Sequence, residues 1–340
     1  MHKLGLLPFV KKAQFNEGRI STSWILSALF GSSSTRYFHA LINLQDLAIA
    51  SLDLVMFPSV VGAFFGHFAP TLRSLALITP VGNRRQLLDF FRLFPKLDDI
   101  TICGYYGEGE NQEALDGKLV PIRGGLRGQL KLKNFHDRGL LKDLIVAFGG
   151  MRFTSMRLES VRGVSLLLKA CADTLRTVYI HPGDRFHPGE GVTEVHIPDA
   201  RTDVTLSVTP SRFDFSRNAV IQTLEIPLHS AHIHARTISA LSTIISPAFS
   251  ELVIIFSGAG CWQKLLADVL VDMYKIKQFR VKFCLEASEE SMAQSLERLA
   301  ADTWKATAQG IYDFLPFPPV VCSRPLSSFD CFCQSSPVVA

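Results

Sequence analysis

Two copies of one short phrase, LRSLAL at residues 72–77 and LDDITI at residues 97–102, are separated by a segment with helical spacing. In each copy apolar residues alternate with others, and this period of two predicts a short strand with one buried face. Between the copies, Asn83 is a suitable N-cap for a helix that Pro95 would end. The unit is therefore strand, turn, helix, turn. A unit of this kind can bury its apolar face only against a neighbouring unit.

Degenerate copies of the phrase continue in both directions along the chain. Successive first positions differ by 22 to 30 residues, apart from one step of 46. Most steps lie in or close to the roughly 20–29-residue period of leucine-rich repeats. The sequence therefore predicts an α/β fold, a leucine-rich-repeat-like solenoid of strand-turn-helix units with degenerate repeats. The Asn that usually follows the phrase is absent, so a looser α/β arrangement stays open as the alternative. The copies begin at residues 44, 72, 97, 127, 153, 175, 221, 249 and 276.

The repeats define the expected domain organisation. Residues 1–40 are expected to be an N-terminal cap or remnant segment, and residues 41–312 form the solenoid. Residues 313–340 are rich in Pro, Ser and Cys without periodicity, which predicts a disordered tail. Glycine-rich insertions at residues 104–125 and 181–209 predict surface loops. Further helix-like runs occupy residues 21–30, 136–148, 163–174, 233–245, 263–274 and 291–308.

Composition excludes several classes of protein. With 47% hydrophobic and 19% charged residues, the chain can bury a sizeable core. The net charge is only +4 and no run of Lys or Arg exceeds two residues, which argues against a nucleic-acid partner. Seven scattered cysteines fit buried thiols of a cytoplasmic or nuclear protein better than a disulfide framework. The apolar run at residues 4–10 is too short for a signal peptide, and Pro58 and Pro70 interrupt the longest uncharged run, so no membrane segment is expected.

No motif predicts chemistry, so we expect no enzyme activity, no catalytic residue, no cofactor and no metal site. His229, His232 and His234 have metal-ligand side chains, but no Cys lies nearby to complete a site, and a polar loop is the favoured interpretation. Cys331 and Cys333 are separated by one residue instead of the two usual in zinc knuckles. The glycine runs match neither a P-loop nor a dinucleotide fingerprint, and no G-x-S-x-G elbow is present.

The solvent face of the strands is the candidate functional surface. Residues out of register with the apolar positions of each phrase point away from the core, and in a solenoid they line one extended face that usually binds partners. Its cations oppose few acids, which indicates an acidic or polar protein partner, although a merely solvated face is the alternative. Tyr179 is the strongest single candidate, because exposed Tyr is enriched at interaction hot spots. The candidates are Asp99, Thr101, Lys131, Arg157, Tyr179, Glu225, Arg280 and Lys282.

Three stretches carry a resemblance to a known group: FFGHFAPTLRSLAL at residues 64–77, RRQLLDFFRLFPKLDD at residues 84–99 and FDFSRNAVIQTLE at residues 213–225. They resemble the F-box and leucine-rich-repeat proteins of basidiomycete fungi over about residues 36–290. The resemblance implies that the repeats present a protein substrate, while an N-terminal F-box docks a Skp-type adaptor of a cullin–RING ubiquitin ligase.

The first 35 residues contain no recognisable F-box. The chain is accordingly expected to be either the repeat half of a longer protein or a diverged copy without the box. The expected function is the substrate-recognition part of an SCF-type ubiquitin ligase, with a Skp-type adaptor and a cullin as further partners. The alternative is a free-standing leucine-rich-repeat scaffold without a ligase link.

Overall fold

The structure is a computed structural model of the chain, and it divides into two compact units, Met1–Thr174 and Leu175–Ala340. Each unit consists of parallel strands joined by segments that include helices, so the predicted α/β class is confirmed. The residues that the structure describes are 9–15, 41–54, 62, 64–105, 126–181, 214–228, 240–256, 269–273, 279–287 and 320–325.

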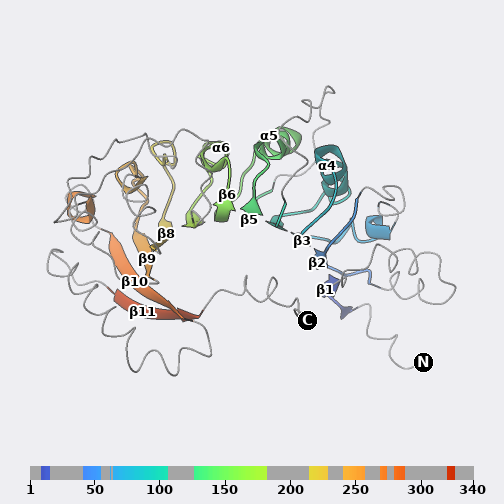
Figure 1. Cartoon of the computed structure of the whole chain (residues 1–340), viewed down its shortest axis with the longest axis horizontal. Helices are drawn as coiled ribbons and strands as arrows, with labels where there is room; N and C mark the ends of the chain where they lie inside the picture. The colour runs from blue at the N-terminus through green and yellow to red at the C-terminus, as the bar shows by residue number, and fades with distance from the viewer. Residues whose placement is uncertain are drawn as a thin grey trace, which may run out of the picture. The chain divides into compact units, whose positions relative to one another are not determined.

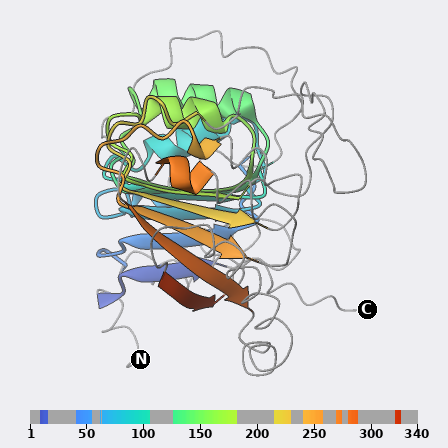
Figure 2. The ribbon, with the colours of Figure 1, turned by 90° about the vertical axis from the view of Figure 1, so that its left-hand side faces the viewer.

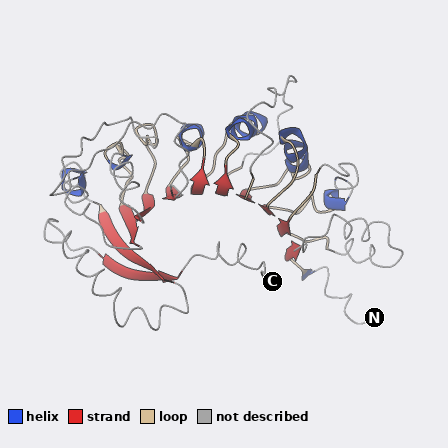
Figure 3. Cartoon of the chain, viewed as in Figure 1, coloured by secondary structure: helices blue, strands red, loops and turns tan. Residues whose placement is uncertain are grey.

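The first unit holds six parallel strands that are neighbours in chain order, β1 to β6. Three helices follow β3, β5 and β6 and lie on one side of these strands (Figures 1 and 3). The strands are β1 (Lys12–Phe15), β2 (Asp46–Ala50), β3 (Ser74–Ile78), β4 (Asp99–Cys103), β5 (Gln129–Phe135) and β6 (Ser155–Val161). The helices are α4 (Arg84–Arg92), α5 (Arg138–Ala147) and α6 (Val164–Ala170).

The strand register aligns the predicted phrases. Leu75 of β3 pairs with Leu47 of β2 and with Ile100 of β4, and the same row continues through Leu130 and Met156. All five side chains are between 1% and 2% exposed. The predicted copies of the phrase in this unit are therefore neighbouring strands, and the apolar positions form the buried face as expected.

Helix α4 begins and ends as its sequence predicts. The Asn83 side chain accepts a hydrogen bond from the backbone of Gln86 over 2.9 Å, and the Gln86 side chain accepts one from the Asn83 backbone over 2.8 Å. This reciprocal pair satisfies two amides that a helix N-terminus would otherwise leave unpaired. Helices α5 and α6 also lie inside their predicted ranges. Residues 240, 241 and 269–273 are helical within two of the other predicted runs.

At the entry of β2, β3, β4 and β6, a backbone carbonyl just before the preceding strand accepts hydrogen bonds from two successive amides. The Gln45 carbonyl accepts from the amides of Arg73 and Ser74 over 2.8 and 2.9 Å, and the Arg73 carbonyl accepts from those of Asp98 and Asp99 over 2.8 and 2.9 Å. Each carbonyl that accepts two hydrogen bonds in this way fixes the first residues of one strand against the neighbouring strand. The carbonyls that do this in the first unit belong to Lys11, Gln45, Arg73 and Gly128.

The strands β2 to β6 share a second backbone feature at their carboxyl ends. Five residues in matching positions have a left-handed backbone, with φ of +55° at Ser51, +47° at Thr79, +69° at Gly104, +50° at Asn134 and +51° at Ser160. Left-handed φ costs residues with a Cβ roughly 1–2 kcal/mol, so a row of them requires support from the surrounding fold. We call these five residues the left-handed row. Its members lie within one residue of the carboxyl ends of β2 to β6.

The second unit repeats the arrangement with five parallel strands, whose arrows point the same way within the unit (Figure 2). Val178, Leu224, Leu252 and Val281 occupy one row and are each at most 1% exposed. The Arg176 carbonyl accepts from the amides of Gln222 and Thr223 over 2.8 and 3.0 Å, as in the first unit. The strands are β7 (Thr177–His181), β8 (Thr223–Leu228), β9 (Glu251–Phe256), β10 (Arg280–Ala287) and β11 (Val320–Pro325).

Two strands lie where the sequence predicted none. Strand β1 falls in the segment expected to be a cap, and its backbone pairs with β2. Strand β11 falls in the expected disordered tail, and its backbone pairs with β10. The prediction of disorder is therefore wrong for residues 320–325, because pairing with β10 orders their backbone. The other residues of the tail, and the predictions for residues 21–30, 106–125, 182–209 and 291–308, lie outside the described residues.

Candidate partner-binding face of the strands

The side chains that alternate with the buried phrase positions of β2 to β6 form what we call the strand face of the first unit. Parallel registration places them in three rows that cross the strands. The first row is Asp46, Ser74, Asp99, Gln129 and Ser155. The middle row is Ala48, Ala76, Thr101, Lys131 and Arg157. The third row is Ala50, Ile78, Cys103, Lys133 and Glu159.

Four of the predicted site residues, Asp99, Thr101, Lys131 and Arg157, lie on this face and are partly exposed. Asp99 has a structural role there, because its Oδ1 accepts a hydrogen bond from the backbone amide of Gln129 over 2.6 Å. A Cβ at position 128 would lie 2.0 Å from the same oxygen. Residue 128 therefore has to be glycine for the Asp99 carboxylate to form this hydrogen bond. The other three side chains are better placed to meet a partner.

A group of charged side chains gathers on β5 and β6. Arg157 donates from Nε to Oε1 of Glu159 over 2.7 Å, and Nζ of Lys133 lies 3.6 Å from Oε2 of the same carboxylate. These three side chains are between 12% and 19% exposed. Together with Lys131 they form what we call the cationic cluster, which contains three cations and one carboxylate. The sequence prediction omitted Lys133 and Glu159, although both follow from extending the period of two by one step.

Lys131 and Arg157 are register partners on adjacent strands. Burial, and then the neighbouring charge of Arg157, lower the pKa of the Lys131 ammonium, while Asp99 acts in the opposite direction. Like charges directly opposite one another on paired strands are destabilising. The fold thus holds positive charge at this place at a cost in stability.

The other side chains of the middle row are small. Ala48 and Ala76 occupy the positions of β2 and β3 in line with the two cations, and Thr101 lies between them on β4. In the three rows, the positions on β2 to β4 carry no Lys or Arg, while they include the carboxylates of Asp46 and Asp99. The cations are therefore confined to one end of the strand face.

In the second unit, the expectation of an exposed Tyr179 is wrong. Tyr179 is 5% exposed and belongs to a buried group with Val253 and Ile255, which are 6% and 1% exposed. Alternation along the strand places Tyr179 in the same row as Glu225 and Val253, as predicted. The apolar neighbours, which alternation alone does not reveal, remove the tyrosine from solvent. The hot-spot argument for Tyr179 therefore does not hold.

The remaining candidates of the second unit are charged. Glu225 is partly exposed and Arg280 is exposed. Nζ of Lys282 lies 2.5 Å from Oε1 of Glu251, and Glu251 is also the register partner of Arg280. One acid therefore lies beside both cations, and the basic excess expected here is partly neutralised.

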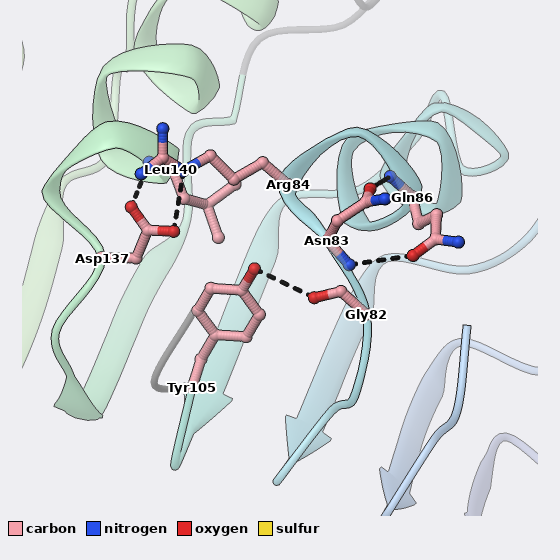
Figure 4. Close-up of polar contacts among 7 residues, drawn as sticks. All are labelled: Gly82, Asn83, Arg84, Gln86, Tyr105, Asp137 and Leu140. Carbon is pink, nitrogen blue, oxygen red and sulfur yellow. Dashed lines mark hydrogen bonds and ion pairs between the residues drawn. The ribbon is translucent and has the colours of Figure 1, made fainter. Parts of the chain in front are cut away.

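The polar contacts between α4 and α5 have structural roles (Figure 4). Asp137 is the N-cap of α5 and accepts from the amide of Leu140 over 2.9 Å. Its second oxygen accepts from Nε of Arg84 over 2.8 Å, and this hydrogen bond raises the pKa of Arg84. Tyr105 donates from its hydroxyl to the carbonyl of Gly82 over 3.2 Å. Because both side chains of the ion pair are buried and satisfied within the fold, this group joins two helices and is not a candidate for catalysis.

Within the described ranges, no group of three His, Cys, Asp or Glu side chains could hold a metal ion. The cluster of His229, His232 and His234 and the pair Cys331 and Cys333 lie outside those ranges. In the same part of the chain no helix combines the length and the apolar character that crossing a membrane requires.

Comparisons of the chain with protein-family models, with curated proteins and with solved structures found no match. The function must therefore be argued from the strand face and from the resemblance noted in the sequence.

Proposed function

We propose that this protein is a protein–protein interaction module of leucine-rich-repeat type that binds a partner on its strand face. In its leading form, the proposal makes the chain the substrate-recognition part of an SCF-type ubiquitin ligase in the cytoplasm or nucleus. Such a protein carries out no chemistry itself, because ubiquitin transfer belongs to its partners. The ligase link is supported by the resemblance of residues 64–77, 84–99 and 213–225 to fungal F-box and leucine-rich-repeat proteins.

The observation that carries the binding role is the set of registered rows on β2 to β6. Neighbouring strands lie about 4.8 Å apart, so each row offers side chains at regular intervals to an extended or loop segment of a partner. The described helices of this unit lie on the opposite side of these strands (Figure 3). Its mixture of small, hydroxyl and charged side chains suits recognition better than a hydrophobic core would.

A free-standing scaffold is the second candidate, and strand β1 is the observation that favours it. An F-box consists of helices, whereas Lys12–Phe15 is a strand that pairs with β2 and extends the repeat array. These residues lie in the segment where the resemblance would place the box.

A binding experiment with the full chain and the host's Skp-type adaptor and cullin separates the two candidates. Stoichiometric retention of the adaptor by the folded chain is the result expected of a ligase receptor. Clean absence of the adaptor, with the chain shown to be folded by circular dichroism, would overturn the ligase link and leave the scaffold.

A pair of matched variants tests the face itself once a partner is in hand. Thr101→Arg places a long side chain in the centre of the strand face, whereas Val146→Arg adds the same side chain on the exposed surface of α5, where Val146 is 58% exposed. Loss of the partner only with Thr101→Arg supports the face. Equal retention by both variants would contradict it.

A further inference from the structure

We propose that Cys284 and Cys322 form a disulfide bond when a peroxide oxidises the protein, and that this bond fastens β11 to β10. Both residues belong to the second unit, and the proposed binding role of the strand face is not required. The observation that carries the proposal is the register of the two strands, which places one cysteine opposite the other.

The two cysteines are 38 positions apart in the chain but are neighbours across the sheet. Strands β10 and β11 are parallel, and neighbouring strands lie about 4.8 Å apart. This spacing is inside the range of roughly 4.4–6.8 Å that disulfides span between Cα atoms. Register partners also lie on the same face of a sheet. Among the described strands cysteine occurs only in β10, in β11 and in β4 of the first unit, so this is the one place where the register pairs two of them.

The residue types on the two strands favour this register. Two positions after the cysteines, on the same face, Glu286 lies opposite Arg324. Opposite charges at register positions stabilise paired strands. A slip by one residue would separate these charges and move every side chain of the strand to the other face. The same register that pairs the charges therefore pairs Cys284 with Cys322.

The other neighbours of the pair limit the choice of partner. On its second side, Cys284 lies opposite Ile255 of β9, which has no sulfur and is 1% exposed. Strand β10 is the only described strand that pairs with β11. The thiols that compete for Cys322 are therefore those of Cys331 and Cys333, which follow it by nine and eleven residues.

The oxidation needs a two-electron acceptor, and hydrogen peroxide is the one proposed. The thiolate of one cysteine attacks a peroxide oxygen, breaks the O–O bond and becomes a sulfenic acid, while the leaving oxygen is released as water. The second thiol attacks the sulfenic sulfur, forms the S–S bond and releases another water. The two sulfurs thus lose two electrons, and the peroxide is reduced to two molecules of water.

The new bond would secure the attachment of β11. It closes the loop between residues 284 and 322, which restricts the unfolded chain and so stabilises the folded one. In reducing compartments such disulfides are usually transient and respond to oxidants. A single reversible crosslink of this kind needs no disulfide framework elsewhere in the chain.

The test oxidises the full chain with hydrogen peroxide, alkylates the remaining thiols and maps the disulfides by mass spectrometry. Trypsin and a protease that cuts before Asp separate the competing cysteines. The resulting peptides are residues 283–298 with Cys284, residues 313–329 with Cys322, and residues 330–340 with Cys331 and Cys333. The expected product joins the first two peptides, and dithiothreitol separates them again.

Variants then test the pairing and its effect on stability. Cys322→Ser is expected to abolish the linked product, whereas the matched control, in which Cys331→Ser and Cys333→Ser are combined, should retain it. Oxidation should raise the melting temperature of the control by about 5 °C or more and leave that of Cys322→Ser unchanged. Melting curves of the reduced variants show that each one is folded.

Three results would overturn the proposed bond. They are a link between residues 313–329 and 330–340 in place of the expected one, a link between two copies of the chain on a non-reducing gel, and no link under conditions that oxidise glutathione to its disulfide. The expected link without a rise in melting temperature would overturn the fastening of β11.

Discussion

Arg84 and Asp137, which are 53 positions apart in the chain, form one buried ion pair between the first turn of α4 and the N-cap of α5. The two side chains are 12% and 6% exposed (Figure 4). The pair ties the helix that follows β3 to the helix that follows β5. It therefore links two repeats on the side of the strands that carries the helices.

We expect Asp137→Ala to lower the free energy of unfolding by about 3 kcal/mol or more, because it leaves a buried guanidinium without its carboxylate and also removes an N-cap. Equilibrium urea unfolding measures the change. Asp173→Ala, at an exposed position of the same unit, is the matched control and should stay within about 0.5 kcal/mol of the unmodified protein. Equal effects of the two substitutions would contradict the role assigned to the pair.

Gly139 leaves the space that the Arg84 guanidinium occupies. A Cβ at this position would lie 2.3 Å from Cζ of Arg84. Replacing Gly by Ala inside a helix normally stabilises it by up to about 1 kcal/mol. We expect Gly139→Ala to destabilise the protein instead, because the arginine must move away from Asp137.

A double-mutant cycle checks this explanation. In an Arg84→Ala background the clash is gone, and Gly139→Ala should then be neutral or stabilising, as helix propensity predicts. The same destabilisation in both backgrounds would mean that the cost of the methyl group has another origin.

The left-handed row predicts a stabilising substitution at Thr79. A β-branched residue is strained at φ +47°, whereas Asn tolerates this region better. Because Thr79 is exposed, Thr79→Asn should raise the free energy of unfolding by about 1 kcal/mol. A lower melting temperature for Thr79→Asn would show that its side-chain contacts outweigh the backbone strain.

Gly104 in the same row predicts the opposite effect. Gly104→Ala should destabilise the protein, because the alanine Cβ would be strained at φ +69° and would lie 2.9 Å from Cγ2 of Thr79. Thermal melting in a Thr79→Ser background, which lacks that methyl group, separates the two causes. A loss that is unchanged there would assign the whole effect to the backbone.

The lowered pKa of Lys131 predicts a pH-dependent stability. The folded state releases the ammonium proton below the ordinary value of 10.5, so the cost of the charge is present at neutral pH and disappears as pH rises through that value. Lys131→Met should therefore stabilise the protein at pH 7, and its advantage should shrink as the pH approaches and passes 10.5. Lys142→Met, at an exposed position, should show no such trend in urea unfolding from pH 7 to the alkaline limit.

Much of the architecture could be predicted because the phrase carries its own periodicity. The alternation in residues 72–77 and 97–102 specified which side chains are buried, and the helix signals at Asn83 and Pro95 specified α4. Strands β1 and β11 escaped prediction because their sequences, KAQF and VVCSRP, do not contain the phrase. Pairing with an adjacent strand, which no local pattern reports, orders their backbone.

The candidate site was only partly predictable for a related reason. The alternation of apolar and polar residues predicts on which side of the strand a side chain lies, so the prediction put Lys131 and Arg157 on the correct side. Burial on that side depends on neighbours from other strands, and Val253 and Ile255 bury Tyr179 against the prediction. The left-handed row also has a sequence signal, which the prediction did not use. Each member lies seven residues after the first position of its phrase and is Ser, Thr, Gly or Asn.

The double acceptor carbonyls in the turns explain how such irregular repeats can coexist in one array. The alignment of β2, β3, β4 and β6 is set at the entry of each strand by two amides on one carbonyl, such as those of Arg73 and Ser74 on Gln45. Alignment at that point does not depend on the length of the connection that precedes it. Insertions and deletions between strands can therefore accumulate without shifting the strand face.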